Sequence, residues 1–229
     1  MNEAARLASS GAPHGTVVLA DEQTSGVGRL GRSWISERDV GLYCSIVLRL
    51  RVRAEELPVV TLALGLATVD AIQTSSDTAC DLRWPNDVLI HERKVAGILA
   101  QLLEGSIIAG IGINVNQTAM PEHLRTPATS LRLETGRVHS RETLLTNLLE
   151  SAEALCSVLT AEGAQSIIRA FCEASTYAVD RRIIIEDTGQ KGITEGIDEN
   201  GYLLMRADNG RLERIATGGI RPDHLFAQA

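Results

Sequence analysis

A glycine-rich loop near the N-terminus places the tightest limit on how this chain can fold. The segment QTSGVGRLGRSW spans residues 23–34, and its Gly26, Gly28 and Gly31 match the G-x-G-x-x-G pattern of dinucleotide-binding folds. Such a fold needs a helix that begins in the loop and packs back on the sheet. Only nine residues, RSWISERDV, separate the last glycine from the next predicted strand, and they lack a helical apolar period. A doubly wound dinucleotide fold is therefore excluded. A protein-kinase loop is excluded as well, because no H-R-D or D-F-G segment follows.

The first 177 residues predict a mixture of strands and helices. GLYCSIVLRL at 41–50 alternates strictly, which predicts a strand with one buried face. Two apolar runs joined by Glu104-Gly105-Ser106 predict a tight hairpin. The predicted strands are 16–23, 41–50, 81–90 with a break at Pro85, 95–103 and 107–115. The predicted helices are 2–9, about 53–74, 140–159 and 164–173.

The pattern changes after Tyr177. Short apolar runs are separated by turn clusters at Thr188-Gly189, Glu199-Asn200-Gly201 and Asp208-Asn209-Gly210. Several short strands with such turns are typical of a small β-barrel. We therefore expect an α+β domain with a mixed sheet over residues 1–177, followed by a C-terminal barrel over 178–229.

Composition narrows the class of protein. Apolar residues make up 44% and charged residues 22%, as in ordinary soluble proteins, and the net charge is −7. An acidic surface repels nucleic acid and anionic membranes, so we expect neither as a partner. The four cysteines have no metal-binding spacing, and we find no signal peptide and no apolar span of membrane length. We expect reduced core thiols and a cytoplasmic protein.

The glycine loop carries Arg29 and Arg32 and no acidic residue. Glycine lets a backbone approach a ligand closely, and arginine donates in a fork that suits phosphate or carboxylate. The loop is either a flexible surface turn or an anion site that closes over a ligand. Two arginines in an acid-free loop of an acidic protein favour the anion site.

A second group of polar residues lies in RWPNDVLIHERKVAGIL, residues 83–99. Pro85 interrupts the strand before Asn86 and Asp87, and Lys94 opens the next strand. The carboxylate and the ammonium suit Mg²⁺ and an anionic substrate, although a solvent-exposed hairpin explains the same residues. In GIGINVN, Asn114 is predicted to be a buried amide whose partner is either backbone or ligand.

Taken together and in this order, these motifs closely resemble those of the biotin protein ligases. The matching patterns are Q-x-x-G-x-G-R-x-G-R-x-W, W-P-N-D, R-K-x-A-G-I-L and G-I-N. GITEGIDENGYLLM and GGIRP are similar to the SH3-like barrel of the same family. The resemblance extends from Asn2 to Pro222.

The resemblance implies a catalytic domain like those of class II aminoacyl-tRNA synthetases and biotin ligases. It implies that biotin and ATP, with Mg²⁺, form biotinyl-5′-AMP, and that biotin passes to a lysine of the biotin carboxyl carrier domain of acetyl-CoA carboxylase or a related carboxylase. The matching catalytic positions are Lys94, Arg29 and Asp87. The matching biotin-binding positions are Gln23, Gly28, Arg29, Lys94 and Gly97. The matching nucleotide-binding positions are Arg29, Arg32, Trp34, Asn86, Asp87 and Asn114. Metal ligands stay unassigned.

The chain departs from the family pattern at two positions. The family usually has Ser-Thr-Asn before its first helix, whereas Met1 stands in the place of the threonine and Asn2 matches. Either the natural start lies upstream, or the biotin pocket lacks these hydroxyls. Many members also have a basic residue at the position of Val27, which leaves Arg29 and Arg32 to supply the positive charge.

Three other functions compete with that of a biotin ligase. DNA binding is not expected, since the first strand begins at Thr16 and leaves no room for an N-terminal helix-turn-helix. A lipoate ligase shares the fold and a similar lysine, but its R-R-x-[ST]-G-G-G loop is absent. The third alternative is a non-catalytic ligand sensor or a peptide-binding barrel, and Tyr202 and Phe226 are too few aromatics to line a peptide groove. The sequence leaves open whether the chain is a monomer or a homodimer.

Overall fold

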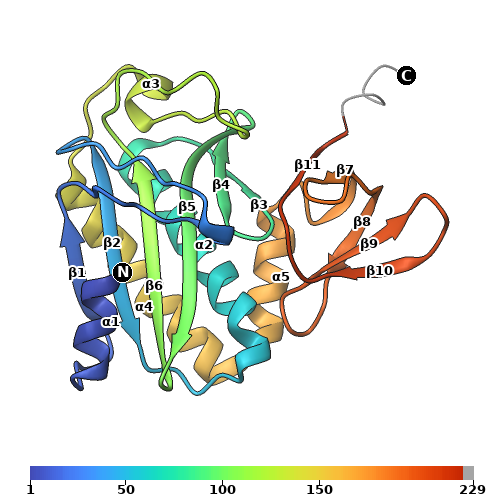
Figure 1. Ribbon diagram of the computed structural model, residues 1–229, viewed down its shortest axis with the longest axis horizontal. Helices are drawn as coiled ribbons and strands as arrows, with labels where there is room; N and C mark the ends of the chain where they lie inside the picture. Colours follow the sequence, from blue (N-terminus) through green and yellow to red (C-terminus); the bar gives the residue numbers. More distant parts are fainter. Residues whose placement is uncertain (224–229) are drawn as a thin grey trace.

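A six-stranded sheet forms the centre of the first part of the chain, in the order β1-β2-β6-β5-β4-β3 (Figure 1). The computed structural model describes residues 1–223, so Phe226 lies outside the described part. The strands are β1 Thr16–Ala20, β2 Gly41–Leu48, β3 Asp81–Arg83, β4 Asp87–Ile90, β5 Arg93–Leu103 and β6 Ser106–Asn114. These strands pair antiparallel, and parallel pairing enters through an isolated bridge between Lys94 and Ala128. β1 ends before its predicted limit, because the chain turns into the glycine loop.

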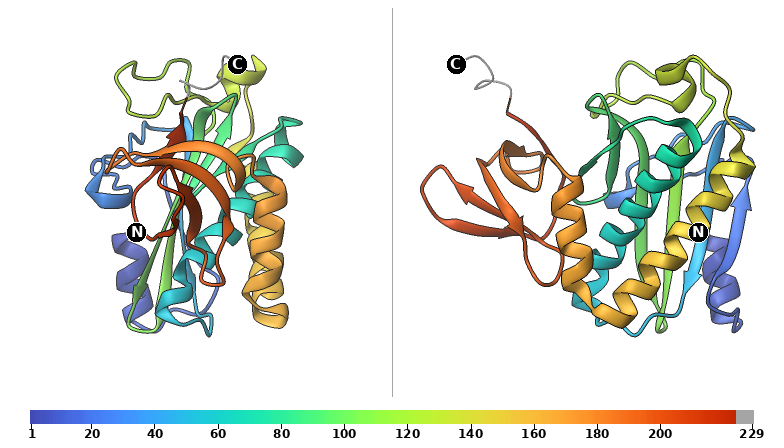
Figure 2. Two further views of the ribbon diagram at one scale, coloured as in Figure 1. Left: turned by 90° about the vertical axis from the view of Figure 1, so that its right-hand side faces the viewer. Right: turned by 180° about the vertical axis from the view of Figure 1, so that it is seen from behind.

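Helices lie on both faces of this sheet. They are α1 Asn2–Ser9, α2 Leu57–Ser76, α3 Leu131–Thr135, α4 Arg141–Glu162 and α5 Ala164–Ala174, with short 3₁₀ turns η1 Arg29–Gly31 and η2 Ala54–Glu56. α2 and α4 cover one face, and α1 packs on the other face against β1, β2 and β6 (Figure 2). The predicted α+β class with flanking helices is confirmed. The short α3 was not predicted; the Ser130 hydroxyl caps it by accepting from the Leu133 N–H at 3.1 Å.

The expectation that β2 is buried on one face only is wrong. All of its residues are buried. Leu42, Cys44, Ile46 and Leu48 belong to the main core, as their alternation predicts. On the other face, Val47 packs with Ala4 and Ala8 of α1, and Tyr43 and Ser45 line a cleft. Helix α1, which is remote from β2 in the sequence, therefore covers part of the face that was predicted to be exposed.

The expectation that the chain has no apolar span of membrane length is corrected by helix α2. The segment Ala54–Ser76 is long and apolar enough to pass for a membrane span by composition, with a mean hydropathy of 1.5. In the structure, however, 61% of the apolar stretch within this segment is buried. α2 contacts α4, α5 and β5, which is the position of a core helix. The apolar side chains of α2 therefore pack in the core of the fold.

The C-terminal part forms a second sheet of five antiparallel strands, in the order β10-β9-β8-β7-β11. Its strands are β7 Val179–Ile185, β8 Lys191–Ile197, β9 Leu203–Ala207, β10 Leu212–Ile215 and β11 Ile220–Pro222. The three predicted turn clusters connect the first four strands, and their glycines Gly189, Gly201 and Gly210 all have positive φ. The sheet agrees with the SH3-like architecture, with β10 and β11 as its edges rather than a closed barrel. The expected boundary at residues 177 and 178 falls between α5 and β7.

A buried hydrogen bond ties the two parts together. Trp84 is 2% exposed, and its indole N–H donates to the Gly201 carbonyl at 3.0 Å. Gly201 lies so close to Pro58 and Val59 at the start of α2 that a Cβ would come within 2.8 Å of the Val59 nitrogen. The C-terminal sheet is therefore held beside the W-P-N-D segment and the start of α2.

Candidate active site

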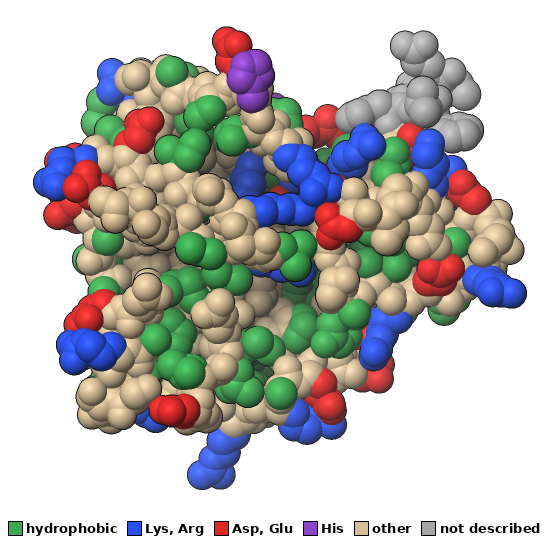
Figure 3. Space-filling view, viewed as in Figure 1, with side chains coloured by type: hydrophobic (Ala, Val, Ile, Leu, Met, Phe, Trp, Pro, Cys, Tyr) green, Lys and Arg blue, Asp and Glu red, His purple; other side chains and the backbone are tan. Residues whose placement is uncertain are grey.

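A cleft of about 1130 Å³ opens on the face of the large sheet that carries α1 (Figure 3). The glycine loop, the starts of β4 and β5, and the Gly218-Gly219 turn of the C-terminal sheet all line it. Every residue that the sequence assigned to the site also lines this cleft, namely Gln23, Gly28, Arg29, Arg32, Trp34, Asn86, Asp87, Lys94, Gly97 and Asn114. The fold thus brings together residues as far apart in the sequence as Gln23 and Gly219.

The floor of the cleft is a row of directly paired residues across four strands. Tyr43 of β2 pairs with Gly112 of β6, Gly112 pairs with Gly97 of β5, and Gly97 pairs with Asp87 of β4. The two glycines leave the backbone bare in the middle of the row. A Cβ on Gly112 would lie 2.6 Å from the Trp34 ring, and a Cβ on Gly97 would lie 3.2 Å from it. Glycine inside a strand allows this close approach of a flat group.

The Trp34 ring covers the bare floor. The Lys94 Nζ lies 5.3 Å from the centroid of its ring, within range of a cation–π contact. The Trp34 indole N–H is buried and has no hydrogen-bond partner among the described residues. Met1 covers the next position of the floor, where a Cβ on Gly110 would come within 2.7 Å of its sulfur. The floor therefore becomes accessible only when the Trp34 ring moves.

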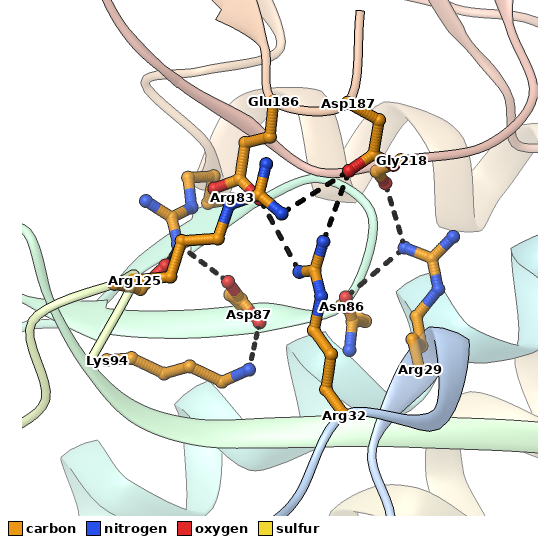
Figure 4. Close-up of polar contacts among 11 residues, drawn as sticks. Arg29, Arg32, Arg83, Asn86, Asp87, Lys94, Arg125, Glu186, Asp187 and Gly218 are labelled. Atoms are coloured by element: carbon orange, nitrogen blue, oxygen red, sulfur yellow. Dashed lines mark hydrogen bonds and ion pairs between the residues drawn. The ribbon is translucent and has the colours of Figure 1, made fainter. Parts of the chain in front are cut away.

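Asp87 stands at the end of the row between two cations (Figure 4). Its carboxylate accepts from Lys94 at 2.5 Å and from Arg83 at 2.7 Å. Burial raises the pKa of Asp87, but the charges of Lys94 and Arg83 outweigh it, so the pKa lies below its ordinary value. The predicted carboxylate and ammonium do meet, and they pair with each other. Asp87 fixes Lys94 beside the floor.

Arg29 reaches out of the glycine loop to both parts of the molecule. Its guanidinium donates to the Asn86 side-chain oxygen at 3.4 Å and to the Gly218 carbonyl at 3.2 Å. The Asn86 amide in turn donates to the Ile98 carbonyl at 2.8 Å, which fixes its orientation. Burial lowers the pKa of Arg29, and the carboxylate of Asp87 is the largest opposing influence. Arg29 is thus a cation held at the junction of loop, sheet and C-terminal domain.

The buried Asn114 amide bonds to the backbone and to a neighbouring side chain. Its nitrogen donates to the Thr129 carbonyl at 3.0 Å, and its oxygen accepts from Gln117 at 3.5 Å. Thr129 follows the segment that pairs with the start of β5, where the Lys94 N–H donates to the Pro127 carbonyl at 2.8 Å. Asn114 therefore steadies the wall of the cleft behind Lys94.

The glycine loop forms a compact turn in this state. Gln23 bridges to Ser36, and its side-chain oxygen accepts from the Ser36 hydroxyl at 3.1 Å. The Gly28 N–H donates to the Arg32 carbonyl at 2.7 Å. A Cβ on Gly26 would lie 2.3 Å from the Trp34 carbonyl, so the loop closes on itself at a position that excludes a side chain.

Sequence reasoning missed four charged residues of the site: Arg83, Arg125, Glu186 and Asp187. Arg83 is 5% exposed and donates to both Asp87 and Thr126. The other three form ion pairs with one another or with Arg32 at the mouth of the cleft. The W-P-N-D motif flagged the segment next to Arg83. No local pattern distinguishes Glu186 and Asp187 from any other acidic turn.

Metal-ligating side chains do not cluster in the described part of the chain. No group of three His, Cys, Asp or Glu side chains in this part of the chain is arranged to hold a metal ion. Asp87 was the predicted carboxylate near Mg²⁺, but both of its oxygens are bonded to cations.

Comparison with known proteins assigns the family. Residues 2–117 match the Biotin/lipoate A/B protein ligase family. The chain is 32% identical over 228 residues to the biotin–[acetyl-CoA-carboxylase] ligase of Mycobacterium tuberculosis, covering 94% of this chain and 82% of the relative. It is 32% identical over 223 residues to the bifunctional ligase/repressor BirA of Bacillus subtilis, covering 93% and 68%.

The fold agrees with that assignment. The structure of the biotin protein ligase of Aquifex aeolicus in complex with biotin and ATP superposes with a TM-score of 0.80, at 31% identity, covering 94% of this chain and 92% of that one. The family match covers half of the chain, and the sequence and structural similarities extend over nearly all of it. The chain belongs to the biotin/lipoate protein ligase family.

Proposed function

We propose that this protein is a biotin–protein ligase, which makes biotinyl-5′-AMP from biotin and ATP and passes biotin to a lysine of a carrier protein. The main support for this proposal is the floor formed by Gly97 and Gly112, which has no side chains. Lys94 lies beside this floor, and Asp87 holds it there. The bicyclic ring of biotin fits such a floor, and its carboxylate tail then points to a fixed ammonium. The relatives named for biotin and ATP support the same substrates.

The chemistry joins two anions, so it needs positive charge and alignment rather than a side-chain nucleophile. A carboxylate oxygen of biotin attacks the α-phosphorus of ATP, the bond to the β-phosphate oxygen breaks, and pyrophosphate leaves. The lysine amine of the carrier then attacks the carbonyl of the mixed anhydride, loses a proton, and releases AMP. Alignment of the reactants supplies roughly 7–11 kcal/mol, and one well-placed charged donor adds about 2.7–4 kcal/mol.

The cleft residues take the following roles in this proposal. Lys94 screens the carboxylate and the α-phosphate, Asp87 positions Lys94, and Arg29 holds the adenylate from the loop side. Gln23, Gly28 and Gly97 border biotin. Trp34 leaves the floor and packs near adenine, while Arg32, Asn86 and Asn114 surround the nucleotide.

The setting of the reaction is part of the proposal. The acceptor is the biotin carboxyl carrier domain of acetyl-CoA carboxylase or a related carboxylase, in the cytoplasm. All four cysteines are free, as a reducing compartment requires. They are not all core thiols, since Cys80 and Cys172 are half-buried. Mg²⁺ enters bound to ATP.

The alternatives are not favoured. The family description covers lipoate ligases, but the Mycobacterium tuberculosis and Aquifex aeolicus relatives reported above are named for biotin. A non-catalytic sensor has no need of the buried pair of Arg83 and Asp87 that fixes Lys94.

The test is pyrophosphate release with ATP and either biotin or lipoate. We expect rapid release with biotin and much slower release with lipoate. Lys94→Ala serves as the inactive control. Turnover with lipoate that equals or exceeds turnover with biotin contradicts the proposed function.

A further inference from the structure

Two arginines from separate loops meet two carboxylates of the C-terminal domain at the mouth of the cleft (Figure 4). Arg32 Nη1 lies 3.4 Å from Glu186 Oε2, and its Nη2 lies 3.3 Å from Asp187 Oδ1. Arg125 Nε lies 3.3 Å from the same Glu186 oxygen, and its Nη1 lies 3.4 Å from the same Asp187 oxygen. The two arginines thus share one pair of oxygen atoms. We call these four residues the clasp.

The clasp is an arrangement that can exchange partners. Its distances exceed the roughly 2.7–2.9 Å of strong charge-assisted hydrogen bonds, and neither arginine has a carboxylate of its own. The side chains of Arg32 and Arg125 are 43% and 49% exposed, so water screens both. The Asp187 side chain is 39% exposed as well, so its pairs with both arginines are of the exposed kind that contributes little to stability. The guanidinium groups are therefore free to move to a better anion.

The carboxylates, in contrast, are seated in the C-terminal domain. The Glu186 side chain is 4% exposed, and its backbone N–H donates to the Gly219 carbonyl at 2.9 Å. A Cβ on Gly219 would lie 2.8 Å from the Glu186 carboxylate, and one on Gly218 would lie 3.1 Å from that of Asp187. The two glycines make room for the acids. Exchange then moves the arginines and leaves the acids in place.

Arg32, Arg125 and Glu186 line the same cleft as Lys94 and Arg29. We propose that Glu186 and Asp187 are resident counter-ions, which the outer phosphates of ATP displace from Arg32 and Arg125. The arginine fork matches a phosphate group, and a triphosphate carries more charge than the two carboxylates. Arg125 is then a nucleotide-binding residue. The acids lower the affinity for ATP, because a bound nucleotide must first free the arginines.

The proposal rests on the proposed function only in naming ATP as the polyphosphate. The test compares the wild-type protein with Glu186→Gln/Asp187→Asn by calorimetry, without biotin, using ATP, tripolyphosphate and AMP. We expect ATP and tripolyphosphate to bind roughly three- to tenfold tighter to the variant, in keeping with the small contribution of the exposed pairs at Asp187. Binding of AMP stays unchanged, because AMP has no outer phosphates. Arg125→Gln weakens ATP binding by a similar factor and reduces the gain from removing the acids.

A matched control removes the same charge from the same domain. Glu195→Gln/Asp208→Asn changes two exposed carboxylates that pair with Arg206 and Arg182 and do not line the cleft. We expect this control to leave ATP affinity unchanged. Equal tightening in the control means that net charge alone is responsible and overturns the proposal. Unchanged or weaker ATP binding in Glu186→Gln/Asp187→Asn overturns it as well, since the acids then position the arginines instead of competing for them.

Two further readouts keep the test decisive. Thermal unfolding shows whether each variant is folded at the assay temperature, and Asp187→Asn alone gives the same direction of change if the double variant is not. A wild-type protein that does not bind ATP contradicts the proposed function. In that case the tripolyphosphate comparison still decides whether the acids compete for the arginines.

Discussion

Asp87→Asn is expected to destabilise the protein more than removal of the lysine that it holds. Asp87 is the shared counter-ion of Lys94 and Arg83, and the Arg83 side chain is 6% exposed. Breaking a buried ion pair by neutralising one partner costs about 3–5 kcal/mol, because a buried charge is left uncompensated. Asparagine still accepts one hydrogen bond, so we expect the lower end, about 3 kcal/mol. For a chain of this size that lowers the unfolding temperature by roughly 6–12 °C.

Lys94→Met is the matched comparison. The Lys94 side chain is 21% exposed, and without it Asp87 keeps its bond to Arg83. We therefore expect a loss of about 1 kcal/mol or less, as for a partly exposed pair. The assay is differential scanning calorimetry of both variants at pH 7. Equal unfolding temperatures for Asp87→Asn and the wild-type protein refute the reasoning, since Arg83 then needs no buried counter-ion.

The same pair predicts a dependence on pH. The pKa of Asp87 is lowered in the folded protein, so its stabilising effect is present above the pKa of the unfolded chain and is lost as the pH falls through the folded value. The gap in stability between the wild-type protein and Asp87→Asn should be constant from pH 7 to 5 and should narrow below about pH 3.9.

The remaining predictions concern the cleft. Lys94→Ala should slow adenylate formation by roughly 10²–10³-fold. Arg29→Gly should still form the adenylate but release it into solution. The released adenylate should label lysines of bystander proteins, which mass spectrometry of a mixed protein pool detects. If Arg29→Gly abolishes adenylate synthesis as completely as Lys94→Ala, both cations belong to the chemical step. Biotin should change the fluorescence of Trp34 as the ring leaves the floor, and Trp34→Phe should remove that change; an identical signal from Trp34→Phe rules the movement out. Gly112→Ala places a Cβ 2.6 Å from the ring position and should weaken biotin binding at least tenfold by calorimetry, because the floor is no longer bare; unchanged affinity argues against a ligand on this floor.

The local elements of the fold were predictable because each has a pattern of its own. The alternation of 41–50 identified the face of β2 that meets the core, and Pro85 marked the break between β3 and β4. Asn114 was predicted to be buried, and it is. Alternation within one segment does not show which distant element packs against its other face. Val47 was therefore predicted to be exposed, although α1 lies over it.

The missing part of the site depends on contacts that no local pattern encodes. Arg32 meets Glu186 and Asp187 across more than 150 residues. Arg125 lies in a loop without a motif, and Arg83 was part of a motif but gave no sign of its link to Thr126. The contacts of Arg32 and Arg125 follow from how the C-terminal sheet packs beside the cleft, which the Trp84 bond to Gly201 helps to fix. Residue type and spacing do not determine that packing.

The most direct test of the proposed function is intact-mass spectrometry of a purified biotin carboxyl carrier domain after incubation with this protein, ATP, Mg²⁺ and biotin. The proposed function predicts that the carrier domain gains the mass of one biotinyl group. The gain should require ATP, should disappear when the acceptor lysine is replaced by arginine, and should fall sharply with Lys94→Ala. A carrier domain that keeps its original mass, while a known biotin ligase modifies it under the same conditions, contradicts the proposed function.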